Sequence, residues 1–294
     1  MSLALKPIAP AIMRGVARRL EIPSCLLSLN DLRKLFRLLE QKAQEAADRQ
    51  VAVLTLQPGQ TPAQLHELQT SVRTAMALVL RLQTNSEWIN GTPMELLDDD
   101  KLPDGLLRIE FDSAFMYRAR FNNLVPNNAF TIILDLGRTS VSDMQATPQQ
   151  NTSAASISGV DTTWANAVYD EVVGFFRQRR SKRGWLHLPR SYDLLLFLVG
   201  FPFSLDVVYH LDRVIRRVAE LPQALSVALY VYVVLLVLLF FRISFNYARW
   251  AFPKVEIDAP RQHIAVGHRI AISSLALMVI SVLVEAALKL VGIG

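Results

Sequence analysis

The feature that most constrains this chain is an uncharged stretch at 221–241, in its C-terminal third. The stretch reads LPQALSVALYVYVVLLVLLFF, twenty-one residues without a charge before Arg242. At about 1.5 Å per residue, a helix of this length crosses the roughly 30 Å hydrocarbon core of a bilayer. A surface helix of a soluble domain keeps a polar face, which this stretch lacks. It therefore predicts a transmembrane helix.

A second apolar segment at 270–291 predicts a second span. Glu285 and Lys289 lie four residues apart near its end. At that spacing opposite charges share one face of a helix and neutralise each other. The sequence thus predicts a C-terminal transmembrane module over 221–294, preceded by enough chain for one domain of ordinary size.

The segment 192–210 leaves the number of spans open. Its apolar run is twelve residues long, ends at Asp206 and contains Gly200 and Pro202, which together favour an interfacial segment. The charges favour a third span, because only then does the connection 242–269, with five basic residues, lie in the cytosol.

We expect two complete spans, at 221–241 and 270–291, since the unbroken stretch 221–241 shows what an unambiguous span looks like in this chain. In that arrangement 181–220 is a basic juxtamembrane and interfacial segment. The connection after the first span then lies outside the cell, and the N-terminal domain lies in the cytosol. The protein is expected to be a multi-pass membrane protein.

A dense basic run precedes the apolar part of the chain. Six basic residues and no acid fall within fourteen residues: Arg177, Arg179, Arg180, Lys182, Arg183 and Arg190. Beside membrane helices, such a run predicts contact with anionic lipid headgroups on the cytosolic leaflet, not with nucleic acid.

Residues 21–180 have the mixed periodicities of a soluble α+β domain. Capping residues predict helices over 29–48, from Pro62 onward, and over 162–180. Short β-branched or alternating runs predict strands at 25–27, 51–56 and 76–83, of which the last also suits a continuation of the preceding helix. Residues 1–20 form a lead-in without the apolar core of a secretory signal. Their basic composition leaves an organellar presequence, a surface helix or a disordered segment as alternatives.

Three alternating segments predict an antiparallel meander sheet that the helices cover. Apolar and polar residues alternate over 107–112, 115–121 and 130–136, with short breaks between them. Short breaks suit antiparallel pairing, because parallel strands need a longer crossover. The polar segment 137–163 is expected to be a long loop.

Arginines on the polar side of this meander are the predicted ligand-binding residues. Arg108, Arg118 and Arg120 fall on its polar positions, and Arg138 follows its last strand. Guanidinium groups on an open sheet face bind phosphate or carboxylate with two hydrogen bonds. The alternative is that the neighbouring acids Glu110, Asp112 and Asp135 pair with these arginines across the strands.

Other chemistry is not indicated. The run 98–100 of three aspartates lacks the spacing of a calcium loop and is expected to be solvated. His263 and His268 have no third ligand at a fixed spacing, and Cys25, the single cysteine, excludes an intrachain disulfide. No phosphate-binding or catalytic motif is present. We predict no catalytic residue, metal or cofactor.

The sequence favours an integral membrane protein whose cytosolic domain binds a partner or a small anionic ligand. Its C-terminal helices serve as an anchor and as a surface for a homo-oligomer or a protein partner. Two alternatives remain: a pore-forming or transport component gated by the domain, and a membrane-bound enzyme acting on a phosphorylated substrate. The absence of catalytic motifs disfavours the enzyme.

Overall fold

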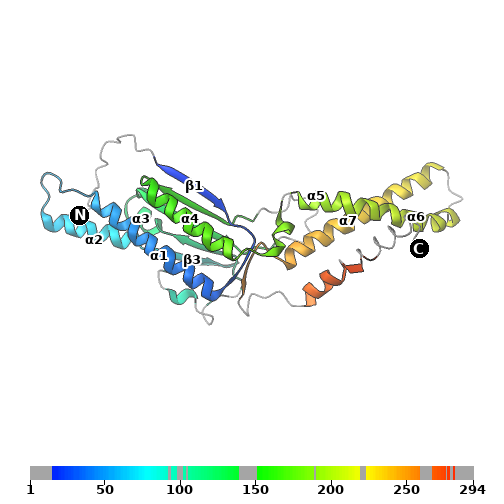
Figure 1. The fold of residues 1–294 in the computed structure, drawn as a ribbon, viewed down its shortest axis with the longest axis horizontal. Coiled ribbons are helices and arrows are strands. Elements are labelled where there is room, and N and C mark those ends of the chain that lie inside the picture. The colour runs from blue at the N-terminus through cyan, green and yellow to red at the C-terminus, as the bar shows by residue number, and fades with distance from the viewer. Residues whose placement is uncertain are drawn as a thin grey trace. The chain divides into compact units, whose positions relative to one another are not determined.

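The chain divides into two compact units in a computed structural model (Figure 1). The domain unit comprises 1–137, 151–181 and 255–262, and the helical unit comprises 138–150, 182–254 and 263–294. The structure describes residues 15–91, 94–97, 102–103, 105–138, 151–188, 190–218, 223–258, 267–275, 277–278 and 281.

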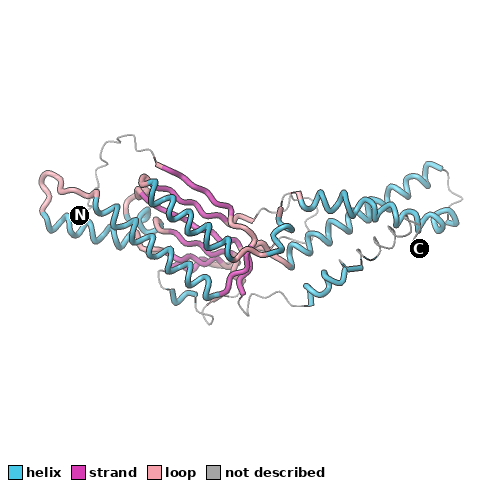
Figure 2. Tube along the Cα trace, in the orientation of Figure 1, coloured by secondary structure: helices cyan, strands magenta, loops and turns pink. Residues whose placement is uncertain are grey.

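The domain unit is built on a six-stranded antiparallel sheet, so the predicted α+β class is confirmed (Figure 2). The spatial order is β1-β7-β6-β5-β3-β4, in which β5, β6 and β7 form a meander. The strands are β1 (Val16–Glu21), β3 (Val79–Gln83), β4 (Trp88–Gly91), β5 (Arg108–Asp112), β6 (Asn128–Asp135) and β7 (Ala154–Gly159).

Helices cover one face of this sheet. The long helices α1 (Leu29–Ala52) and α4 (Thr162–Gln178) run along that face in Figure 1, and α2 (Pro62–Ala75) packs on α1. Both predicted N-terminal caps are confirmed. The side chains of Ser28 and Thr61 accept from the backbone three residues on, and Asp31 and Gln64 return the bond.

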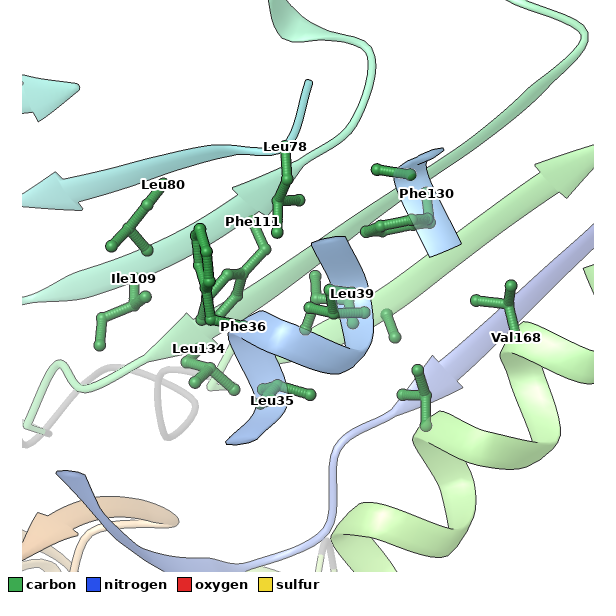
Figure 3. Packing of buried hydrophobic residues seen from close by; sticks show 14 of the residues in the cluster. Leu35, Phe36, Leu39, Leu78, Leu80, Ile109, Phe111, Phe130, Leu134 and Val168 are labelled. Atoms are coloured by element: carbon green, nitrogen blue, oxygen red, sulfur yellow. The ribbon is translucent and has the colours of Figure 1, made fainter. Parts of the chain in front are cut away.

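The core lies between the helices and the sheet (Figure 3). Leu35, Phe36 and Leu39 of α1 meet Phe111 and Phe130 of the sheet, and all five are at most 2% exposed. Burying each such side chain contributes roughly 1.5–3 kcal/mol. Because strand residues alternate between faces, the polar residues of the same strands project from the opposite face, which we call the open face.

The strand predicted at 51–56 is wrong. Helix α1 continues to Ala52, and residues 54–57 form no strand. Gln50 and Val51 are buried on the face of α1 that packs in the domain. Tertiary packing of that face therefore outweighs the strand preference of the β-branched residues.

The middle segment of the predicted meander is also a helix. Residues 115–120 form α3 (Phe115–Arg120) within the connection between β5 and β6. Tyr117 and Phe121, which alternation placed on one strand face, instead contact each other at four-residue helical spacing, with tilted rings whose centroids are 4.7 Å apart. Asn122 and Asn123 then adopt positive φ angles of 49° and 62°, which end the helix.

Four strands lie where none was predicted: β1, β4, β7 and β8 (Val255–Asp258). β7 falls inside the expected loop 137–163: Ala155 and Ile157 face the core and Ser156 and Ser158 are exposed, so small residues carry the alternation. β1 begins inside the expected lead-in 1–20 and pairs with β7. The expected acidic loop at 98–100 lies outside the described residues.

The structure also contains a second, two-stranded sheet. Only its first strand was predicted from the sequence. The expected strand at 25–27 is β2 (Cys25–Ser28), and it pairs in parallel with β8 (Val255–Asp258). β8 follows the long apolar helix in the chain, yet it belongs to the domain unit. The polypeptide therefore returns to the domain after that helix.

The helical unit consists of two long antiparallel segments. The first runs without interruption from 191 to 218 as α5 (Ser191–Leu195), a π-helical turn η3 (Leu196–Gly200) and α6 (Phe201–Val218). The second is α7 (Gln223–Ala251). Phe203 contacts Phe241 at a centroid distance of 5.5 Å, and Tyr230 donates to Asp212 at 2.6 Å.

Gly200 and Pro202 do not end the first segment, contrary to the sequence argument for an interfacial piece. The π-helical turn immediately before α6 changes the hydrogen-bond pattern at the proline, which cannot donate a backbone bond. Gly200 lies close to α7: a Cβ there would stand 3.5 Å from the ring of Phe241. This is an ordinary van der Waals distance, so an alanine would also fit beside α7.

Two described helical stretches are long and apolar enough to cross a membrane: Ser191–Asp212 and Leu225–Ala251. The second overlaps the span predicted at 221–241. The first falls in the segment expected at the interface. Most of the span predicted at 270–291 lies outside the described residues, although 267–275 is helical.

Candidate functional site

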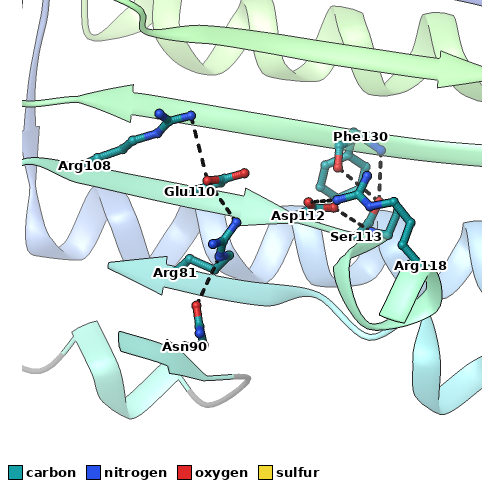
Figure 4. Close-up of polar contacts among 9 residues, drawn as sticks. Arg81, Asn90, Arg108, Glu110, Asp112, Ser113, Arg118 and Phe130 are labelled. Atoms are coloured by element: carbon teal, nitrogen blue, oxygen red, sulfur yellow. Dashed lines mark hydrogen bonds and ion pairs between the residues drawn. The ribbon is translucent and has the colours of Figure 1, made fainter. Parts of the chain in front are cut away.

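The open face of the sheet carries a cluster of charged side chains centred on Glu110 (Figure 4). Arg81 on β3 and Arg108 on β5 both approach this carboxylate. Arg81 Nη1 lies 3.4 Å and Arg108 Nη2 3.9 Å from Glu110 Oε2. Glu110 is buried, so its charge is shared mainly between these two guanidinium groups.

Arg81 is held on two sides by aromatic rings. Its guanidinium carbon lies 4.4 Å from the ring centroid of Trp88 and 4.6 Å from that of Phe115. Its Nε also donates to Asn90 Oδ1 at 3.1 Å. Sequence reasoning missed Arg81, although it occupies the polar position of a predicted strand. The missing information was the fold, which brings Phe115 of α3 to β3.

Arg118 does not belong to this cluster, because it lies on α3 and pairs with Asp112. Asp112 is 1% exposed, and its Oδ1 accepts the backbone N–H of Ala114 at 2.8 Å while its Oδ2 pairs with Arg118. Arg118 thus neutralises the buried carboxylate of Asp112 at the start of α3. Arg120 follows on the same helix and is exposed.

Arg81, Arg108 and Glu110 together carry one net positive charge, and Asp135 lies opposite Arg108 in the register of β5 and β6. Arg81 and Arg108 share one carboxylate, whereas Arg118 and Asp112 neutralise each other. A guanidinium has five N–H donors, and Arg108 Nε has no hydrogen-bond partner among the described residues. That Nε is buried, so a further carboxylate or phosphate oxygen could be bound only by the other N–H groups of the two guanidinium groups.

Arg138, the fourth arginine predicted for the sheet face, belongs to the helical unit. Its guanidinium carbon lies 5.5 Å from the ring centroid of Trp250. The four arginines predicted as one ligand site are thus distributed over β5, α3 and the helical unit. Only Arg108 contributes to the cluster at Glu110.

The basic run also divides. Arg179 Nε bonds Asp31 Oδ1 at 2.8 Å and its guanidinium lies 3.8 Å from the ring of Phe175, so it stabilises the domain. Burial raises the pKa of Asp31, but hydrogen bonds from Ser28 and Arg179 outweigh burial and leave that pKa below its usual value. The exposed members of the run are Arg177, Arg180, Lys182, Arg183 and Arg190.

The helical unit presents apolar side chains outward. Phe197, Tyr209 and Leu236 are 75%, 78% and 63% exposed. Only 11% of the most apolar window of 191–212 and 6% of that of 225–251 are buried. An exposed apolar surface of this extent is typical of contact with lipid or with another protein.

Polar groups interrupt this surface at a few places on α6 and α7. Asp206 Oδ1 and His210 Nδ1 lie 3.6 Å apart on α6, and Asp212 accepts from Tyr230 across the two helices. At the other end of α7, the buried Arg249 donates from Nε to the Leu186 carbonyl at 2.8 Å.

The described part of the chain adds no candidate residues for a catalytic or metal site. No three His, Cys, Asp or Glu side chains gather there in a way that could hold a metal. A depression between α1 and α2 is lined by Glu40, Gln44, Asp48 and Arg73, of which the last two form an ion pair.

Comparison with known proteins gives no relative from which a function could be carried over. No family model, no curated protein and no solved structure matches this chain.

Proposed function

We propose that this chain is an integral membrane protein in which a helical hairpin anchors an α+β domain that binds an anionic ligand or partner. The observation that carries the anchor is the outward-facing apolar surface of 191–212 and 225–251. Exposing that surface to water would cost about 25 cal/mol of free energy for each Å² of apolar area, whereas contact with lipid would avoid this cost.

The proposed hairpin enters and leaves the bilayer on the side of the domain. Chain connectivity supports this topology: the first helix follows α4 of the domain, and α7 leads into β8 of the same domain. The side is proposed to be cytosolic, because Arg190 precedes the first helix and Arg249 and Lys254 lie at the end of the second.

Topology can be tested with single cysteines in a Cys25→Ser background on intact cells. The proposed hairpin predicts that an impermeant thiol reagent labels Gln223→Cys and leaves Ser181→Cys and Asp258→Cys unlabelled until the cells are opened. Two spans at 221–241 and 270–291 predict the reverse at 223 and 258. Extraction of the native chain by alkaline carbonate without detergent would contradict the membrane anchor itself.

The domain is proposed to bind its anion at the cluster of Arg81, Arg108 and Glu110. Two guanidinium groups on one carboxylate support this, since together they carry more positive charge and more N–H donors than that carboxylate uses. Calorimetric titration of the full chain with inorganic phosphate and with succinate is the test. Arg108→Gln should abolish the binding heat, and Arg37→Gln, an exposed arginine on α1, should leave it unchanged.

A second candidate, a transport role for the helices, rests on the ionisable side chains of α6. Charged groups at membrane depth are typical of ion or proton paths. Asp206, His210 and Asp212 lie on the segment that packs against α7. Proteoliposomes loaded with a pH-sensitive dye would report proton flux, and flux that Asp206→Asn abolishes would favour transport over anchoring.

A further inference from the structure

Strand β1 forms one edge of the six-stranded sheet, where it pairs with β7 and with no other described strand (Figure 1). The pairing is regular over all six residues, Val16–Glu21, without a bulge or a proline. Edge strands often carry such interruptions, because an uninterrupted edge can pair with another chain. β1 therefore has the backbone geometry to accept a further strand.

One hydrogen bond fixes the direction of the backbone groups of β1. The N–H of Ile22, directly after the strand, donates to the carbonyl oxygen of Ser153 at 3.1 Å. Backbone groups of a strand point to alternate sides, so the even-numbered residues of β1 bond to β7 as well. The N–H and C=O groups of Ala17, Arg19 and Glu21 then point to the outer edge, and no described residue bonds to them. Each of the three offers one donor and one acceptor to an added strand.

The side chains of β1 leave this outer edge accessible and place a positive charge on each face. On the open face, Arg19 is exposed, and the exposed side chains of the neighbouring strand β7 are the small Ser156 and Ser158. On the face that carries the helices, the guanidinium carbon of the exposed Arg18 lies 5.9 Å from the ring centroid of Tyr169 of α4. An added strand therefore meets one guanidinium group on each of its faces.

The charges of β1 select the kind of strand that it can accept. Arg18 and Arg19 lie at the centre of the edge, and Glu21 at its end is the only acid of the strand. Opposite charges on facing positions of two strands stabilise the pair, whereas like charges destabilise it. Full antiparallel pairing with a second copy of β1 would set Arg18 and Arg19 opposite each other across the two copies. A segment with two consecutive acidic residues is therefore favoured over a second copy of this chain.

We propose that the outer edge of β1 binds an extended, acidic segment of a protein partner as an additional strand of the sheet. Main-chain hydrogen bonds to Ala17, Arg19 and Glu21 hold the segment, and its acidic side chains pair with Arg18 and Arg19. The edge is separate from the cluster at Glu110, because β6 and β7 lie between β1 and β5. The proposal rests neither on that cluster nor on the membrane anchor.

The test uses the full chain in a neutral detergent, immobilised for surface plasmon resonance, and the peptide KVEETV. In antiparallel pairing its two glutamates face the two arginines of β1. Arg18→Glu/Arg19→Glu should weaken binding of KVEETV at least tenfold, and the same variant should bind the charge-reversed peptide EVKKTV at least tenfold more tightly than wild type does. The control Lys34→Glu/Arg37→Glu, on exposed positions of α1, should bind KVEETV as wild type does.

Hydrogen exchange at single amides of the wild-type chain distinguishes an added strand from general attraction between charges. KVEETV should slow exchange at Ala17, Arg19 and Glu21, and it should leave Arg18 and Leu20 unchanged, because these already bond to β7. A further variant, Ala17→Pro, removes one outward donor without removing a bond to β7, so it should weaken binding about tenfold. Ala17→Ser keeps the donor and should bind as wild type does.

Three results would overturn the proposal. The first is equal binding of EVKKTV to wild type and to Arg18→Glu/Arg19→Glu. The second is unchanged exchange at the three outward amides when KVEETV is bound. The third is slowing of those amides with rising protein concentration in the absence of peptide, which would make a second copy of this chain the occupant.

Discussion

The two units differ in which side chains they expose: the domain unit buries its large apolar side chains, whereas the helical unit exposes many of them. In the domain unit, Phe36 and Phe111 are 2% and 0% exposed, whereas in the helical unit Phe197 and Leu236 are largely exposed. The domain turns its polar strand residues outward, and the helices keep their few polar groups between them or at their ends. The difference is expected if water surrounds one unit and lipid the other, because each unit exposes what its surroundings solvate.

The largest expected effect compares a buried residue of the domain with an apolar residue of the hairpin. Phe111→Ala should lower the free energy of unfolding by about 3–5 kcal/mol, because it opens a cavity in the core. Leu236→Ala should change it by less than about 0.5 kcal/mol. Urea unfolding of the full chain in detergent micelles, followed by near-ultraviolet circular dichroism, measures both. A large effect of Leu236→Ala would mean that the hairpin packs as a soluble core.

The next effect concerns the buried ion pair of the domain. Arg118→Ala leaves the carboxylate of Asp112 buried without its counter-charge, and we expect a loss of about 2–3 kcal/mol, reduced because water reaches part of the site. Arg120→Ala, on the same helix and exposed, is the matched control and should lie within about 0.5 kcal/mol of wild type. The same urea titration applies. Equal effects of the two substitutions would contradict a structural role for Arg118.

A smaller effect is the acid dependence of the domain. Because the pKa of Asp31 is lower in the folded state, its ionised form contributes stability above its unfolded value of about 4, and this is lost as the pH falls. Asp31→Asn should therefore cost about 1 kcal/mol at pH 7 and progressively less as the pH falls below about 4. Thermal unfolding between pH 7 and pH 3 tests this, and an offset of the same size at pH 7 and at pH 3 would refute it.

The smallest expected effect is a dependence of the helical unit's stability on pH near neutrality, which the domain unit should not share. Burial lowers the pKa of His187, and the charges of Arg249 and Lys254 act in the same direction, although its contact with the Phe252 carbonyl opposes them. The helical unit should thus lose up to about 1 kcal/mol as the pH falls below about 6.5, before Asp31 titrates. Histidine proton NMR reads the pKa directly. An unshifted His187, or equal pH dependence in His187→Gln, would contradict the prediction.

Local signals in the sequence were sufficient for the helices that begin at side-chain caps. Ser28, Thr61 and Asp161 each cap the helix that was predicted to follow. These bonds join residues two or three positions apart, so no distant part of the chain has to be known. The strands at 25–27 and within 76–83 were found for a similar reason, as short apolar runs between clear helix and turn signals.

Alternation alone failed where a short segment fits two periods. Residues 115–121 place aromatic side chains at spacings of two and of four, so the pattern suits a strand and a helix equally. In the helical conformation that the segment adopts, the backbone N–H of Ala114 donates to the buried carboxylate of Asp112. Segment 154–159 failed in the opposite way, since alanine and glycine mark its buried face too weakly to be recognised.

For the candidate sites, the sequence identified residue types but not their grouping. It selected Arg108 correctly as an open-face residue, and it missed Arg81 and assigned Arg138 to the wrong unit. The aromatic partners of these arginines are distant in the chain: Phe115 for Arg81 and Trp250 for Arg138. A stacking contact of this kind depends on tertiary structure, which neither spacing nor composition encodes.

The sequence by itself determined the long apolar helix, the α+β class of the preceding domain and the basic boundary between them. These follow from local composition and periodicity, which act within a few turns of helix or a few strand residues. Only the tertiary structure decided that 191–218 is one continuous helix beside α7 and that the chain then returns as β8 to pair with β2. Pairing between residues more than two hundred positions apart is set by which backbone edges the whole fold leaves available, and no local pattern contains that information.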